Sequence, residues 1–201
     1  MRIPALVALV LLALAPRAGF ADDSTLNFQG GVGVHPVSNI AGTANADGTF
    51  PNVTRNIVRG VIPAGQIWVL ADLRASVKAD GSIRVDGRGL LLAGGNGIGT
   101  NANASVFATL ICEAAAPFVE RNTDAVGVPL AANGDFRIDD VLSPAPKECA
   151  SPVLLIRSSA GNRTWFAAGF VKLEHWRQPS AAAAVKHPID TAFPIVTILA
   201  V

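Results

Sequence analysis

The sequence predicts an all-β protein: a single-domain antiparallel β-sandwich, or a barrel-like variant of it, with about eight or nine short strands, Greek-key connections and one disulfide. Three observations predict this class. Apolar residues do not recur at helical spacing over three turns anywhere after residue 21, alternation with period two recurs instead, and Gly, Asn, Asp and Pro separate the alternating segments. The length of 201 residues favours one domain.

The N-terminal residues have the pattern of a secretory signal peptide. An apolar run over residues 3–15 follows Arg2, and small residues precede position 22. This favours cleavage between Ala21 and Asp22, with cleavage after Ala18 as the alternative. The run is shorter than the roughly 20 apolar residues that span a bilayer, so an uncleaved anchor is disfavoured. We therefore expect export, to a bacterial periplasm or to the extracellular space.

Amino-acid composition divides the chain into three expected segments. After the signal peptide of residues 1–21, we expect one β domain over residues 22–177 and a linker with a C-terminal strand or tail over residues 178–201. The apolar end of this last segment, residues 193–201, is too short to cross a membrane. A last strand that pairs with the sheet is favoured over a disordered or an interacting tail. We expect no transmembrane segment in the mature chain.

Cys112 and Cys149 are the two cysteines of the chain. An exported protein meets an oxidising compartment, so we expect them to form a disulfide. The closed loop of about 38 residues stabilises the fold by roughly 4 kcal/mol in the chain-entropy estimate. A catalytic thiol is disfavoured, because Cys112 lies in an alternating apolar segment with no adjacent basic residue to stabilise a thiolate.

The alternation of apolar and charged residues determines how many residues the first hairpin turn contains. A two-residue turn at Asp80-Gly81 would place apolar side chains opposite charged ones. A three-residue turn, Ala79-Asp80-Gly81, instead pairs Val77 with Ile83 and Ala75 with Val85, and it gives Gly81 the left-handed position. The sequence therefore predicts the three-residue turn.

A similar triplet, Ala followed by Asp or Asn and then Gly, occurs at two further places in the sequence. Ala132-Asn133-Gly134 predicts a second hairpin, and Ala46-Asp47-Gly48 predicts a third tight turn near the start of the mature domain. The pairs expected in the second hairpin are Leu130 with Phe136 and Val128 with Ile138.

Other strand candidates follow from alternation and apolar content. They span residues 57–62, 67–70, 90–93, 105–113, 153–157 and 164–173. In the fourth of these, alternate residues share a face that we expect to point into the core: Val106, Ala108, Leu110 and Cys112. Trp68 and Trp165 lie in apolar strands, so we expect core packing for both rather than a sugar-stacking platform. Trp176, beside Arg177, is the tryptophan that we expect to be exposed and ligand-facing.

The glycine-rich segment over residues 94–100 does not fit a phosphate-binding loop. Its spacing is neither GxGxxG nor GxxxxGK[ST], and a strand rather than a helix is expected after it. A flexible loop between strands is favoured. The second interpretation is a loop that faces a ligand, because it is long and polar; its side chains would be Asn96, Asn101 and Asn103.

Neither the histidines nor the acidic residues form a metal motif. The histidines are His35, His175 and His187, and no HxH, HxxxH or CxxC spacing occurs. Asp135, Asp139 and Asp140 carry oxygens that suit calcium, but neighbouring strand residues point to opposite faces, so a solvated strand end is favoured. No GxSxG motif occurs either. We expect no metal site and no cofactor.

Turn and core positions between about residues 59 and 170 form a pattern. They are Arg59-Gly60-Val61, Trp68, Asp80-Gly81, Ile83-Arg84-Val85, Gly89-Leu90, Gly134-Asp135, Phe136-Arg137-Ile138 and Trp165-Phe166-Ala167. This pattern resembles a family of small exported β-rich proteins of uncharacterised activity. The resemblance implies a shared β fold, and it carries over no catalytic residues.

Charge restricts the partners. The chain has 16 basic and 15 acidic residues scattered along its length, so it has no basic patch for nucleic acid or for an anionic membrane. We expect an exported, non-enzymatic binding or envelope interaction module with an unknown protein or glycan ligand. The alternative is a secreted hydrolase whose site uses loop His residues with Asp or Glu.

The signal peptide generates the first prediction. Protein recovered from the exported fraction should begin at Asp22, because the small residues before it fit the cleavage site. Intact-mass measurement checks this. A start at Gly19 supports the alternative site, and a chain that retains Met1 contradicts cleavage.

Overall fold

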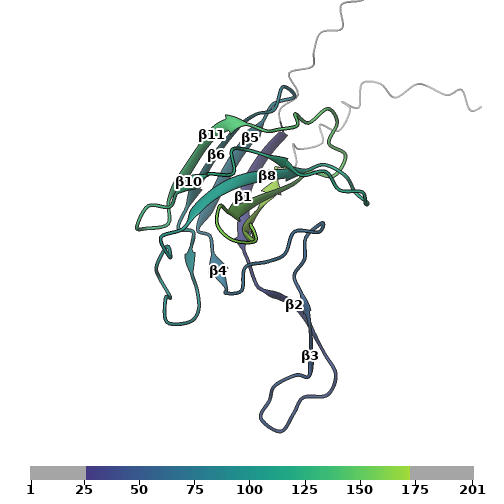
Figure 1. Cartoon of the computed structure of the whole chain (residues 1–201), viewed down its shortest axis with the longest axis vertical. Helices are drawn as coiled ribbons and strands as arrows, with labels where there is room; N and C mark the ends of the chain where they lie inside the picture. Colours follow the sequence, from purple (N-terminus) through teal and green to yellow (C-terminus); the bar gives the residue numbers. More distant parts are fainter. Residues whose placement is uncertain (1–25, 173–201) are drawn as a thin grey trace, which may run out of the picture.

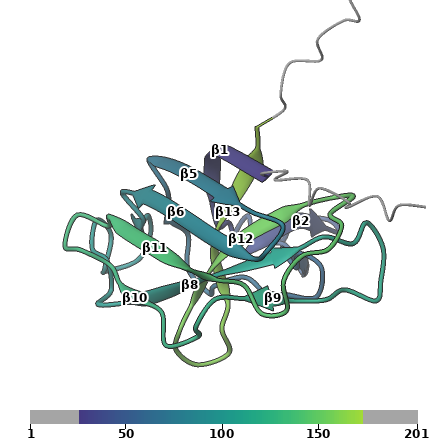
Figure 2. The same cartoon turned by 90° about the horizontal axis from the view of Figure 1, so that it is seen from above.

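The computed structural model describes residues 26–172, and every regular element in this range is a β-strand (Figures 1 and 2). The all-β class is confirmed. Nine strands form one antiparallel sheet: β1 (Leu26–Gly33), β5 (Asp72–Val77), β6 (Ser82–Arg88), β8 (Ser105–Ile111), β9 (Arg121–Asn122), β10 (Val128–Pro129), β11 (Phe136–Val141), β12 (Val153–Ser158) and β13 (Trp165–Val171). Within the described range no helix is long and apolar enough to cross a membrane.

The main sheet curves into a nearly closed barrel. Its strand order is β10-β8-β12-β13-β1-β5-β6-β11, with β9 also paired to β8. The two ends of this order meet, because Asn122 of β9 and Ser143 after β11 exchange backbone hydrogen bonds of 3.0 and 2.8 Å. Strands distant in sequence are neighbours, such as β1 and β13, as Greek-key connections predict.

Alternate residues of the barrel strands point inward and form the core. Leu73 and Val85 have no exposed surface, and Trp68 and Trp165 are buried as predicted. The rings of Trp68 and Phe166 stack with their centroids 4.1 Å apart. The predicted inward face of β8 is buried, and Cys112 is buried with it. The predicted disulfide between Cys112 and Cys149 is confirmed.

The β5–β6 hairpin has the predicted register, with Val77 opposite Ile83 and Ala75 opposite Val85. All three predicted triplets form one kind of turn. In each, the residue before the triplet donates its N–H to the carbonyl of the residue after it, and the glycine N–H donates back to the residue before. The side chain of Asp47, Asp80 or Asn133 accepts the N–H two residues on.

Two strand predictions were wrong. The second triplet makes its turn, but Val128 of β10 pairs with Val106 of β8 and Ile138 of β11 pairs with Val85 of β6. This turn connects the two ends of the sheet order rather than two paired strands, so the pairs expected across it do not form a ladder. Residues 57–62 are a tight turn and not a strand, because Arg59 and Gly60 both have positive φ angles and Val58 and Val61 exchange backbone hydrogen bonds.

The remaining strands form two small sheets. β4 (Trp68–Val69) pairs with β7 (Leu91–Leu92), and β2 (Val37–Ala41) pairs with β3 (Asn52–Arg55). The second pair projects from the barrel (Figure 1). The predicted signal-peptide cleavage site lies outside the described residues, as do residues 173–201 with Trp176 and two of the histidines.

Two glycines of positive φ generate a stability prediction. Gly60 (φ +87°) has open space where a Cβ would stand, whereas a Cβ at Gly134 (φ +81°) would lie 2.6 Å from the Leu90 nitrogen. Gly60→Ala should lower the free energy of unfolding by about 1–2 kcal/mol through the left-handed backbone alone. Gly134→Ala should lower it by about 1–3 kcal/mol more, because the backbone of residue 90 must also shift.

Urea denaturation of both variants measures the difference. Gly60→Ala is the matched control, since Gly60 has a similar positive φ angle and lacks the close contact. Equal losses for the two variants would show that the contact at Leu90 relaxes without cost.

Candidate functional site

The candidate site is the projecting hairpin of residues 37–55, which we call the arm (Figure 1). It consists of β2, β3 and the loop between them. Every residue of the arm is exposed to solvent, so none of them belongs to the buried core of the barrel. A two-stranded hairpin without a packing partner is marginally stable in water. The arm therefore has the exposure of a contact surface.

Apolar side chains gather on the arm. Ile40 and Val53 lie opposite each other in the β2–β3 pair and are 49% and 56% exposed. Val37 and Phe50 are exposed as well. Charged residues are few, because Asp47 and Arg55 are the only two between residues 37 and 55. The arm thus offers a largely uncharged, partly apolar surface.

Hydrogen bonds fix the base of the arm to the barrel. The Asn56 N–H donates to the Pro36 carbonyl, and its side-chain amide donates to the His35 carbonyl, both at 3.0 Å. The indole N–H of the buried Trp165 donates to the Asn56 carbonyl at 3.0 Å. Arg55 donates to the Pro63 carbonyl at 3.0 Å. The base of the arm is therefore tied to a residue of the core.

The tip of the arm is the first triplet turn. The Asp47 carboxylate accepts the hydroxyl of Thr49 at 2.7 Å and the N–H of Thr49 at 2.9 Å. These two hydrogen bonds hold the pKa of Asp47 below its usual range. The tip therefore carries a negative charge at neutral pH.

The predicted ligand-facing asparagines have different environments. The Asn101 amide donates to the carbonyls of Leu130 and Ala131 at 2.9 and 3.0 Å, and its oxygen accepts the Asn103 N–H at 3.0 Å. Asn101 therefore ties the loop to the neighbouring turn. Asn96 and Asn103 are exposed. A ligand-binding role for this loop stays a prediction, as does that of Trp176.

The three aspartates weighed for calcium have separate protein partners. Asp135 accepts the Gly89 N–H at 3.1 Å, and Asp140 accepts the Asp124 N–H at 2.8 Å. Asp139 forms an ion pair of 2.7 Å with Arg84. Across residues 26–172 no three His, Cys, Asp or Glu side chains gather where they could hold a metal ion.

A groove of about 720 Å³ lies on the outer face of β5, β6 and β11, lined by three arginines and three aspartates among other residues. Charges of opposite sign alternate across these strands, and the cross-strand neighbours are Asp72–Arg88, Arg74–Asp86, Asp86–Arg137 and Arg84–Asp139. Exposed pairs of this kind contribute little to stability. Because the charges cancel locally, the groove has no net attraction for a charged ligand.

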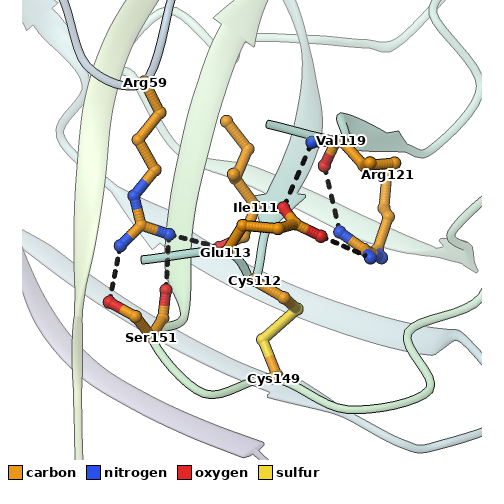
Figure 3. The surroundings of a disulfide bond; sticks show 8 residues. All are labelled: Arg59, Ile111, Cys112, Glu113, Val119, Arg121, Cys149 and Ser151. Carbon is orange, nitrogen blue, oxygen red and sulfur yellow. Dashed lines mark hydrogen bonds and ion pairs between the residues drawn. A yellow bond between two sulfur atoms is a disulfide. The ribbon is translucent and has the colours of Figure 1, made fainter. Parts of the chain in front are cut away.

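Partly buried charged side chains lie near the disulfide and tie loops to the end of β8 and to Ser151, which precedes β12 (Figure 3). The Arg59 guanidinium donates to the carbonyls of Ile111 and Ser151 and, at 2.6 Å, to the Ser151 hydroxyl. Glu113 pairs with Arg121 at 2.8 Å and accepts the Val119 N–H at 3.1 Å. These contacts fasten one loop to the barrel and close another upon itself, which are structural roles.

Arg157 is a buried cation, with a side chain that is 7% exposed. It pairs with Glu120 at 2.6 Å, donates to the Arg163 carbonyl at 2.7 Å and lies 5.3 Å from the centre of the Phe107 ring. Period-two alternation did not reveal this layer, because Phe107 and Thr109 occupy the outward positions of β8 and are nevertheless buried. Arg157 and Arg163 lie over the Phe107 ring, and the Thr109 hydroxyl bonds to Asn122 and Arg157.

Sequence reasoning did not identify the arm as a candidate site. The signal that was available is the Ala46-Asp47-Gly48 turn, which predicted a hairpin tip but not its exposure. Comparisons of the chain with protein-family models, curated proteins and solved structures found no match. The resemblance to a family of exported proteins therefore stays a prediction.

Glu113 generates a pH prediction. The hydrogen bonds from Arg121 and Val119 lower the pKa of Glu113 to about 2 from a usual 4.5. Because the folded-state pKa is depressed, the stabilisation from this carboxylate is present above about pH 4.5 and is lost as the pH falls toward 2. Replacement by Glu113→Gln should destabilise the protein at pH 6, and the difference from wild type should shrink between pH 4.5 and 2.

Urea denaturation across this pH range measures the effect. An NMR titration of the Glu113 carboxyl carbon, repeated in Arg121→Gln, is the control and should show the pKa rise toward 4.5. A stability difference that does not change with pH would contradict the ion pair.

Proposed function

We propose that this chain is an exported, non-enzymatic module that acts by binding at the cell surface or envelope, with the arm as its contact surface. One observation carries the proposal: all residues from 37 to 55 are exposed, although they include an apolar cross-strand pair and are mounted on a hydrogen-bonded base. Exposed apolar surface of this kind marks interaction sites in soluble proteins.

Export is supported by two further features. The N-terminal pattern is typical of a signal peptide, and a disulfide joins Cys112 to Cys149. The alternative remains a secreted hydrolase that uses loop His residues with Asp or Glu, and two of the three histidines, His175 and His187, lie outside the described residues.

An arm-shortened variant tests the proposal. Residues 39–53 are replaced by an Asn-Gly turn, which keeps the Val37–Arg55 pair and the anchors at Asn56. We expect at least about a tenfold loss of binding to the envelope fraction of the producing cell, equivalent to about 1.4 kcal/mol. Binding is measured by sedimentation of labelled protein with that fraction.

Two controls accompany this variant. The thermal unfolding midpoint should stay near the wild-type value, because the arm makes no buried contact with the barrel core. Arg84→Gln, on the outer barrel face, should bind as wild type does. An arm-shortened protein that is folded and binds normally would remove the arm from the function.

A further inference from the structure

We propose that the partner of the arm is a second copy of this chain. Two arms lie side by side in antiparallel orientation and form a symmetric dimer. This inference rests on the proposed function, since it names the partner of the same surface.

The first support is the pair of open strand edges. β2 and β3 form a two-stranded sheet, so each has one edge that no other strand of residues 26–172 occupies. Natural proteins block such edges with charged residues, proline or bulges. β2 contains no charged residue and no proline, and β3 has a single charge, Arg55 at its end. The two strands therefore carry a single charge and no proline to oppose strand addition, although they are short, at five and four residues, and their ladder has one irregularity near Val37.

The second support is the gain from a wider sheet. Side-by-side pairing of two arms makes four strands, whereas two alone are marginally stable. It also brings the Ile40 and Val53 side chains of both copies onto one continuous sheet, where neighbouring apolar residues can shield one another. The dimer therefore supplies the cross-strand contacts that the barrel does not provide.

The third support is charge complementarity, and it selects the orientation. Asp47 lies at the tip of the arm and Arg55 at its base, and no other charge lies between residues 37 and 55. An antiparallel pair related by a two-fold axis brings each tip beside the base of the other copy. Asp47, which lies beyond the end of β2, is then closer to Arg55 of the other copy than to its Asp47. A parallel pair would instead bring Asp47 to Asp47 and Arg55 to Arg55.

Both side chains have free capacity for this contact. Arg55 uses one nitrogen for the Pro63 carbonyl, and a guanidinium carries five N–H donors. Asp47 is exposed, and one of its two oxygens accepts both hydrogen bonds from Thr49. Charges at the edge of an interface chiefly set specificity and orientation. The pair therefore fixes how two arms align, while strand pairing supplies most of the affinity.

Charge exchange tests the dimer. Sedimentation velocity of the exported protein, over a concentration series, should show a monomer–dimer equilibrium. Asp47→Arg and Arg55→Asp should each weaken it at least about tenfold, because each places like charges together at both contacts. The double variant, Asp47→Arg with Arg55→Asp, should dimerise again, and so should an equimolar mixture of the two single variants.

Recovery of dimerisation in the double variant distinguishes an effect of charge from an effect of damage to the turn. Asp47→Arg removes the hydrogen bonds to Thr49 in the single and the double variant alike, so recovery in the double variant reports charge alone. Ile40→Lys provides a second check, since it places a charge on the exposed sheet face and leaves tip and base unchanged. It should also weaken the dimer.

The outcomes distinguish this inference from the proposed function. A wild-type chain that stays monomeric while its envelope binding still requires the arm overturns the dimer and leaves the function standing. Single variants that lose dimerisation without recovery in either the double variant or the mixture overturn the antiparallel arrangement. Dimerisation that persists in the arm-shortened variant places the interface elsewhere and overturns the inference.

Discussion

Closure of the main sheet is the constraint on which the rest of the structure depends. A nine-stranded sheet that stayed open would leave two unpaired edges and an apolar face too wide to cover with the loops of so small a chain. Here the ends of the sheet meet through the hydrogen bonds between Asn122 and Ser143, with the Asp140 carboxylate bound to the Asp124 N–H nearby. The inward side chains then face one another, and the core needs no second layer beneath most of the barrel.

The exception is the outer face of β8 and β12, where arginines organise a second layer. Arg59 and Arg157 each satisfy backbone carbonyls, and each lies within 6 Å of a phenylalanine ring centre. Burial of a cation is costly unless its donors are bonded, and only Arg157 has a carboxylate partner among the described residues. These side chains fasten neighbouring loops to the barrel through hydrogen bonds to Ser151, Arg163 and Glu120. The charged outer face of β5, β6 and β11 needs no such cover, because its ion pairs remain in water.

Much of the barrel could be predicted from the sequence, because its turns carry local chemistry. The alternation of apolar and charged residues, together with a glycine in the left-handed conformation, was enough to predict that Val77 lies opposite Ile83. The same reasoning could not show that Gly134 joins the two ends of the sheet order, since a turn does not determine which strands its arms pair with. Alternation also did not reveal that Phe107 is buried, because the side chains of Arg157 and Arg163, distant in sequence, lie over its ring. The exposure of the arm could not be predicted for a related reason. A triplet turn predicts a hairpin, but whether that hairpin is exposed depends on how the rest of the chain packs.

The three turns also differ in how freely they can vary. At Gly134 the backbone of Leu90 fills the space around the glycine, whereas at Gly48 no atom lies within 4 Å of where a Cβ would stand. The arm meets the barrel chiefly through Asn56 and its immediate neighbours. Substitutions along most of the arm therefore leave the core contacts intact. The surface proposed for binding can therefore change in sequence and in length without altering the packing of the barrel core.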